Sequence, residues 1–185
     1  MTGPSWLHHS GATGPESVTP DTTSIAGSDT PLLGWTLGAL PAGYAAVPSD
    51  SSSTAAVGPS GFHNDGRPAG PGEVDVSVAM RRYENASGGQ LTLSVLKPWR
   101  SPGTAPTGSQ AQRISHELAA SMYGPAARVG VVPGVAAGPA VLVRENAKSL
   151  LIVITGPQAE VAILTGNGPT VDELVGAARS AQRLG

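Results

Sequence analysis

Three apolar runs near the end of the chain constrain its fold most strongly. They cover Ala140–Val143, Leu150–Ile154 and Val161–Leu164, and short polar breaks separate them. Short apolar runs between turn signals predict buried strands, and strands joined by short turns pair antiparallel. Leu150–Ile154 is apolar at every position, so we expect this strand to be covered on both faces and to lie centrally in its sheet.

A helix signal follows the third run. Thr170 and Glu173 have the spacing of a capping box, in which each side chain bonds the backbone N–H of the other residue. Arg179 and Arg183 would then face the negative end of the helix dipole. The apolar stripe of this helix, which we expect to reach the chain end, consists of Val171, Leu174, Val175, Ala178, Ala181 and Leu184.

An alternation with a period of two predicts two long strands in the middle of the chain. Every second residue is apolar from Val74 to Met80, and the pattern returns from Leu91 to Val95. The sequence Asn-Ala-Ser-Gly-Gly at 85–89 accepts positive φ angles. The two strands are therefore expected to form a hairpin, with one row of side chains against a core.

Further strands and a second helix complete the expected domain. Short strands are predicted over 35–39, 127–132 and 137–144. The period changes to that of a helix over Ser109–Tyr123, whose apolar stripe consists of Ala111, Ile114, Leu118 and Met122. The resulting fold class is α+β: a curved antiparallel sheet of about six to seven strands with two helices packed on one face.

The N-terminal part of the chain has a different composition. Residues 1–72 contain 12 Gly, 9 Pro, 10 Ser and 8 Thr, too few large apolar groups to offset the entropy lost on ordering. We expect a disordered leader over 1–30 and a long mobile loop over 48–72. Residues 31–185 are then interpreted as a single α+β domain.

Charge and composition exclude several classes of protein. The formal net charge is −2, and no nucleic-acid partner is expected, because a duplex binder needs clustered cations. The chain has no cysteine, which excludes disulfides and thiolate metal sites. No stretch reaches the roughly 20 apolar residues of a membrane-spanning helix. Membrane attachment would therefore need an anchor that this sequence does not contain.

Histidines and known motifs give no active site. His8, His9 and His63 fall in the leader and the loop, and His116 lies on the exposed side of the predicted first helix, without the fixed ligand spacing of a metal site. The chain has no nucleophile elbow, phosphate loop or dinucleotide fingerprint. We therefore expect no catalytic residues, no metal and no cofactor, and interpret the protein as a non-enzyme.

Aromatic residues next to loops are the candidate ligand contacts. Trp99 follows the second hairpin strand and precedes Arg100. A tryptophan on a loop can anchor a ligand or partner, with the sheet behind it as an apolar wall. Trp99, Arg100 and Trp35, with Met122 on the neighbouring helix, form the predicted ligand-binding set. The alternative interpretation is that the tryptophan rings fill open ends of the sheet.

Two segments resemble a known family. Residues 138–184 place Gly138, Ala140 and Leu142 in a "G-x-x-A-x-L"-like strand, followed by the pattern of Thr170, Glu173, Leu174, Ala178 and Leu184 in the closing helix. The opening "GWTLGALPAGY" at 34–44 is similar to a "W-x-L-x-x-L-P-x-G" phrase. Together they resemble extracytoplasmic sensor and lipoprotein-carrier-like domains of high-G+C bacteria, associated with some anti-sigma factors. The resemblance implies a non-catalytic binding domain with a curved sheet.

Three functional hypotheses follow. The first is a binding or sensing domain outside the cytoplasm, periplasmic or on the cell surface, that holds an apolar or peptide-like ligand such as a lipid or peptide, or a protein partner. The second is a cytoplasmic structural or interaction protein. The third is a small soluble hydrolase with a site built from loops around His63, Asp65 and Arg67.

Overall fold

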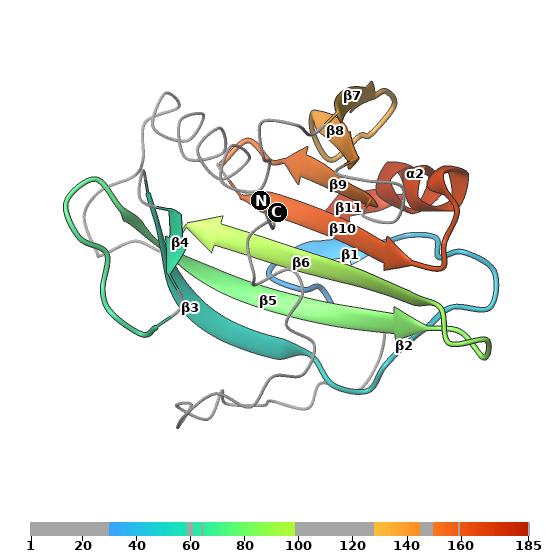
Figure 1. Ribbon diagram of the computed structural model, residues 1–185, viewed down its shortest axis with the longest axis horizontal. Coiled ribbons are helices and arrows are strands. Elements are labelled where there is room, and N and C mark those ends of the chain that lie inside the picture. Colours follow the sequence, from blue (N-terminus) through green and yellow to red (C-terminus); the bar gives the residue numbers. More distant parts are fainter. Residues whose placement is uncertain are drawn as a thin grey trace.

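The computed structural model describes residues 30–58, 61–63, 65–98, 128–144, 150–158 and 160–184 (Figure 1). The predicted leader up to residue 29 and the predicted helix Ser109–Tyr123 lie outside the described residues. The described elements are β1 (Trp35–Leu37), β2 (Ala45–Ala46), β3 (Ser51–Gly58), β4 (Gly61–His63), β5 (Val74–Glu84), β6 (Gln90–Pro98), β7 (Arg128–Val132), β8 (Ala140–Arg144), β9 (Leu150–Thr155), β10 (Val161–Asn167), α2 (Val171–Arg179) and β11 (Ala181–Arg183).

Most of the strands form one antiparallel sheet. Its order is β4-β3-β5-β6-β10-β9-β8-β7, and the short strand β2 pairs with β5 beside β3, which makes nine strands. β1 and β11 form a separate two-stranded sheet. The predicted antiparallel α+β class is thus confirmed at this level, and β9 lies inside the sheet between β10 and β8 as expected.

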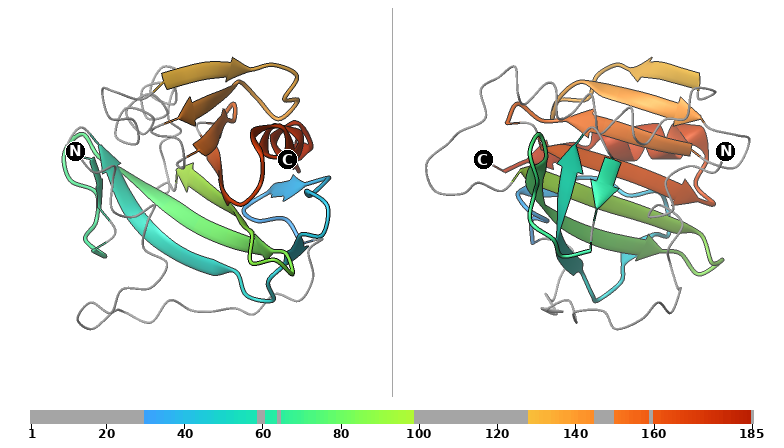
Figure 2. Two further views of the ribbon diagram at one scale, coloured as in Figure 1. Left: turned by 45° about the vertical axis from the view of Figure 1, so that its right-hand side comes forward. Right: turned by 60° about the vertical axis from the view of Figure 1, so that its left-hand side comes forward.

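One face of the large sheet carries α2 and the β1–β11 pair. α2 contacts β9 and β10, and its buried residues Leu174, Ala177 and Ala178 share a cluster with Leu93 and Ile152 of the sheet. Figure 2 shows α2 and β1 on the same side of the curved sheet. We call this the helix-covered face.

The other face, here called the opposite face, has an apolar cluster of its own. Among the described residues, its buried members all belong to strands of the large sheet, from β3 at one side to β8 at the other. They are Ala55, Val57, Val76, Val78, Leu96, Val143, Leu151, Val153, Val161 and Ile163. β9 is apolar from Leu151 to Ile154 because its side chains alternate between the two clusters.

The capping box of α2 has the predicted geometry. The Glu173 N–H donates to Thr170 Oγ1 at 3.3 Å, and the Thr170 N–H donates to Glu173 Oε2 at 2.7 Å. The helix is shorter than predicted, because it ends at Arg179 and the chain continues as β11. β11 pairs with β1, with Trp35 opposite Arg183, and Leu184 is 51% exposed rather than buried on a helical stripe.

The predicted loop over 48–72 is corrected by the structure. β3 occupies Ser51–Gly58 and pairs with β5 from Ser51 opposite Met80 to Val57 opposite Val74, and β4 pairs with the end of β3. Ala55, Ala56 and Val57 are buried. The polar first half of β3 concealed the strand, because its backbone pairs with β5 while its side chains are exposed.

The predicted core row of β5 also needs a correction. Val76 and Val78 are buried on the opposite face, but Met80, in the same row, is 40% exposed. The other row, predicted to face solvent, buries Ala79, Arg81 and Tyr83 on the helix-covered side. A period of two identified the strand but not its covered row, since both faces of this sheet are covered in part.

Candidate functional site

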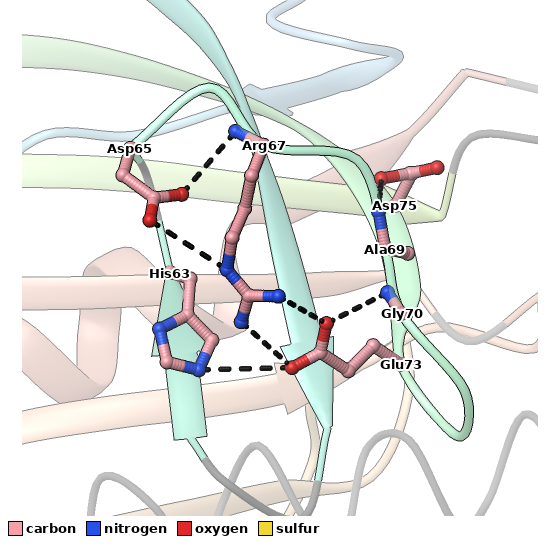
Figure 3. A network of polar contacts seen from close by, with 7 residues as sticks. All are labelled: His63, Asp65, Arg67, Ala69, Gly70, Glu73 and Asp75. Carbon is pink, nitrogen blue, oxygen red and sulfur yellow. Dashed lines mark hydrogen bonds and ion pairs between the residues drawn. The ribbon is translucent and has the colours of Figure 1, made fainter.

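A cluster of polar residues gathers where β4, the loop 65–73 and β5 meet (Figure 3). β4 contributes His63, whose backbone pairs with Ala56 of β3, and Ala56 in turn pairs with Asp75 of β5. The loop between β4 and β5 supplies the remaining residues. We call this set the polar cluster: His63, Asp65, Arg67, Ala69, Gly70, Glu73 and Asp75.

Glu73 is the centre of the polar cluster. Arg67 donates to it twice, from Nη1 to Oε2 at 3.1 Å and from Nη2 to Oε1 at 2.9 Å. The Gly70 N–H donates to Oε2 at 2.8 Å, and His63 Nε2 lies 3.7 Å from Oε1. The Glu73 side chain is 7% exposed, and its hydrogen bond raises the pKa of Arg67 above the usual value. This carboxylate is therefore fully engaged with partners of its own loop.

The two aspartates fix the backbone of the same loop. Asp65 Oδ1 accepts from the Arg67 N–H at 3.3 Å, and Asp65 Oδ2 lies 3.6 Å from Arg67 Nε. Asp75 Oδ1 accepts from the Ala69 N–H at 2.9 Å. Glu73 and Asp75 therefore both hold the loop. Opposite charges six residues apart, flanking a Pro-Ala-Gly-Pro-Gly turn, are the sequence signal for this arrangement.

The chemistry of the polar cluster favours a structural role. The structure brings together His63, Asp65 and Arg67, the three residues of the hydrolase hypothesis, but no residue of the cluster carries a hydroxyl or thiol nucleophile. A carboxylate that accepts three hydrogen bonds is a poor general base. The described residues contain no group of three or more potential metal ligands. The cluster is a clamp that closes the loop between β4 and β5.

A second feature crosses the opposite face of the sheet. Strand register places seven residues side by side in one row, which we call the cross-sheet row: Ser51, Met80, Ser94, Ile163, Val153, Val141 and Val131. Ser94, Ile163 and Val153 in its middle are buried. Met80 near one end is 40% exposed, and Val131 at the other end is 81% exposed. The row is an apolar strip that emerges at the surface at both sides of the sheet.

The predicted ligand contacts relate to these features in different ways. Trp35 is 1% exposed and belongs to the cluster of the helix-covered face, so its ring is a core group. Trp99, Arg100 and Met122 lie outside the described residues. Pro98, the residue before Trp99, ends β6 opposite Val76, which belongs to the apolar cluster of the opposite face. β6 therefore ends beside a member of that cluster.

Comparisons with models of protein families, with curated proteins and with solved structures found no significant match to this chain. Within the described residues, no helix combines the length and the apolar character needed to cross a membrane.

Proposed function

We propose that this protein is a non-catalytic binding domain, and that its ligand or partner covers an exposed end of the cross-sheet row on the opposite face, at Met80 or at Val131. The observation that carries the proposal is the exposure of Met80 and Val131 on one row of one face. Complete burial of a fully exposed apolar side chain contributes about 1.5–3 kcal/mol, and the gain at Met80 is smaller because this residue is only 40% exposed. The middle of the row is buried, so a ligand gains this contribution at an end of the row.

The chemistry of the row defines the class of ligand. Met80, Ile163, Val153, Val141 and Val131 are apolar, and the two serines offer neutral hydroxyls. This lining matches an acyl chain or an extended apolar peptide better than a charged small molecule. The hydrolase alternative is less favoured, because the charges of the polar cluster satisfy one another.

The location of the domain is a separate part of the proposal. The resemblance of residues 34–44 and 138–184 to extracytoplasmic sensor domains favours a site of action outside the cytoplasm. The alternative is a structural protein without a ligand. It differs from the binding proposal in one measurable respect, because it predicts that nothing binds the cross-sheet row.

The test uses two variants of the row and one matched control. Met80→Asp and Val131→Asp place a charge on the row, whereas Leu184→Asp places it on an exposed apolar residue that lies outside the row. Binding of anilinonaphthalene sulfonate and its displacement by dodecanoate are measured by fluorescence. Dodecanoate is shorter than the five strand spacings between Met80 and Val131, so we expect one of the two row variants to weaken binding about tenfold and Leu184→Asp to leave it unchanged. Equal behaviour of all three variants, or no saturable binding, would contradict the proposed function.

A further inference from the structure

The two edges of the large sheet are protected differently. β4 forms one edge, spans three residues and is joined directly to the loop that the polar cluster clamps. β7 forms the other edge, and its outer side pairs with no strand that the structure describes. In Figure 2, β7 and β8 lie at the margin of the sheet. Natural proteins usually protect such an edge with lysine, proline, a bulge or a covering element.

β7 has the composition of a strand that accepts a partner. Its sequence Arg-Val-Gly-Val-Val has no proline, no lysine and no acidic residue. Gly130 and Val131 at its centre are exposed, and because Gly130 has no side chain, its exposure is that of the backbone. An approaching strand therefore meets accessible main chain at Gly130 and an exposed apolar side chain next to it.

We propose that β7 binds an extended peptide segment as an additional strand of the large sheet. The inference rests on the proposed function and deepens it, because the added strand would continue the cross-sheet row. Val131 is followed in the row by Val141 and Val153, so an apolar residue of the partner placed beside Val131 extends the strip by one position. Main-chain hydrogen bonds supply affinity in this binding mode, and alternate side chains supply specificity.

Charge defines the partner further. The β7–β8 hairpin, residues 128–144, contains Arg128 and Arg144 and no acidic residue. Both residues are positively charged, so an acidic residue at this end of an added strand is favoured. The partner is thus an extended segment with apolar residues at every second position and a carboxylate beside Arg128.

The experiment uses fluorescein-labelled peptides of alternating valine and threonine with the full chain. One probe carries two aspartates at its N-terminus, a second carries them at its C-terminus, and counterparts carry lysines. Fluorescence anisotropy gives the affinity, and hydrogen–deuterium exchange reports on the amides of residues 128–132. We expect an acidic probe to bind about fivefold more tightly than its lysine counterpart at low salt, a difference that salt removes. The backbone amides of β7 should exchange more slowly when the acidic probe is bound.

Val131→Lys is the decisive variant, and Leu184→Lys is its matched control. The first places a charge in the centre of β7, and the second places the same charge on an exposed apolar residue outside the large sheet. We expect Val131→Lys to weaken peptide binding at least about tenfold and Leu184→Lys to have no effect. Both side chains are exposed, so neither change should disturb folding.

Several results would overturn the inference. Unchanged exchange at 128–132, or equal effects of the two lysine variants, would exclude pairing at β7. Concentration-dependent dimers that Val131→Lys dissociates, without peptide binding, would assign this edge to a second copy of the chain. If dodecanoate binding stays sensitive to Met80→Asp while peptides fail, the proposed function stands and the inference at β7 fails. If neither probe binds, both are rejected.

Discussion

The buried ion pair of Arg81 and Asp50 gives a quantitative test of the fold. Arg81 is 2% exposed, and its Nε and Nη2 donate to Asp50 Oδ1 at 2.8 Å and Oδ2 at 2.6 Å. The hydrogen bond with Asp50 is the main cause that raises the pKa of Arg81 above its usual value. Asp50→Ala therefore leaves a guanidinium charge in the core without its carboxylate, next to Tyr83.

The expected loss follows from the burial of the pair. Removing one partner of a buried ion pair costs about 3–5 kcal/mol, a large part of a total stability of about 5–15 kcal/mol. Replacing both partners by apolar groups is often close to neutral. We therefore expect Asp50→Ala to lower the free energy of unfolding by about 3 kcal/mol or more. The double variant Asp50→Ala with Arg81→Met should lose less than Asp50→Ala alone.

The free energy of unfolding is measured by urea denaturation. Circular dichroism and tryptophan fluorescence, to which the buried Trp35 contributes, report on the transition. Asp50→Asn is the intermediate variant, because it keeps the shape of the side chain and removes its charge. The reasoning is refuted if Asp50→Ala costs less than about 1 kcal/mol. Additive losses in the double variant would refute it as well, because a coupled pair cannot give them.

Three further predictions concern backbone contacts and the helix cap. Gly138→Ala should cost about 3 kcal/mol in urea denaturation, because φ is 154° and an added Cβ would overlap the backbone oxygen of Thr155, which cannot move aside. Gly89→Ala should cost about 1 kcal/mol, because its Cβ would overlap the Tyr44 hydroxyl and the Asn85 side-chain amide, and Tyr44→Phe, which relieves only the first overlap, should restore part of the loss. A cost for Gly89→Ala equal to that of Gly138→Ala would contradict this distinction. Hydrogen bonds from Thr170 lower the pKa of Glu173 below 4.5, so its contribution is fully present above about pH 4.5 and disappears as the pH falls further. The stability difference between the natural chain and Glu173→Gln should therefore narrow on acidification, and a difference that grows would contradict the assignment.

Features encoded by neighbouring residues were predictable from the sequence. The capping box depends on two residues three positions apart, and it is present as predicted. β9 was recognised because five consecutive apolar residues can be buried only inside a sheet. The β5–β6 hairpin was recognised from its turn, where Gly88 has a φ of 80°. In each case the information lies within one element or one turn.

Features that depend on distant pairing were not predictable in the same way. Ala181 and Leu184 fit a helical spacing, and only the pairing of β11 with β1, near the start of the described chain, turns this segment into a strand. The Leu184 N–H donates to the Gly34 carbonyl at 2.7 Å, a contact that no local pattern contains. β3 was missed for a similar reason, since its polar half is a strand because β5 lies beside it.

The candidate sites also differ in whether neighbouring residues or distant strand pairing determines them. His63, Asp65 and Arg67 lie close in sequence, and the structure brings them together, whereas Glu73 was not part of the predicted group because its partner Arg67 lies across a turn. The cross-sheet row draws on seven residues of seven strands. Its composition follows from register, which a single sequence does not specify.

The difference between the two faces explains why the row is the stronger functional candidate. The helix-covered face is closed by α2 and β11, which follow β10 directly in the chain, so its cover forms with the sheet itself. Among the described residues, the buried members of the cluster of the opposite face all belong to sheet strands, and its row reaches solvent at Met80 and Val131. Covering these exposed ends gains hydrophobic free energy. Binding is therefore favoured on the opposite face, where Met80 and Val131 can still be buried.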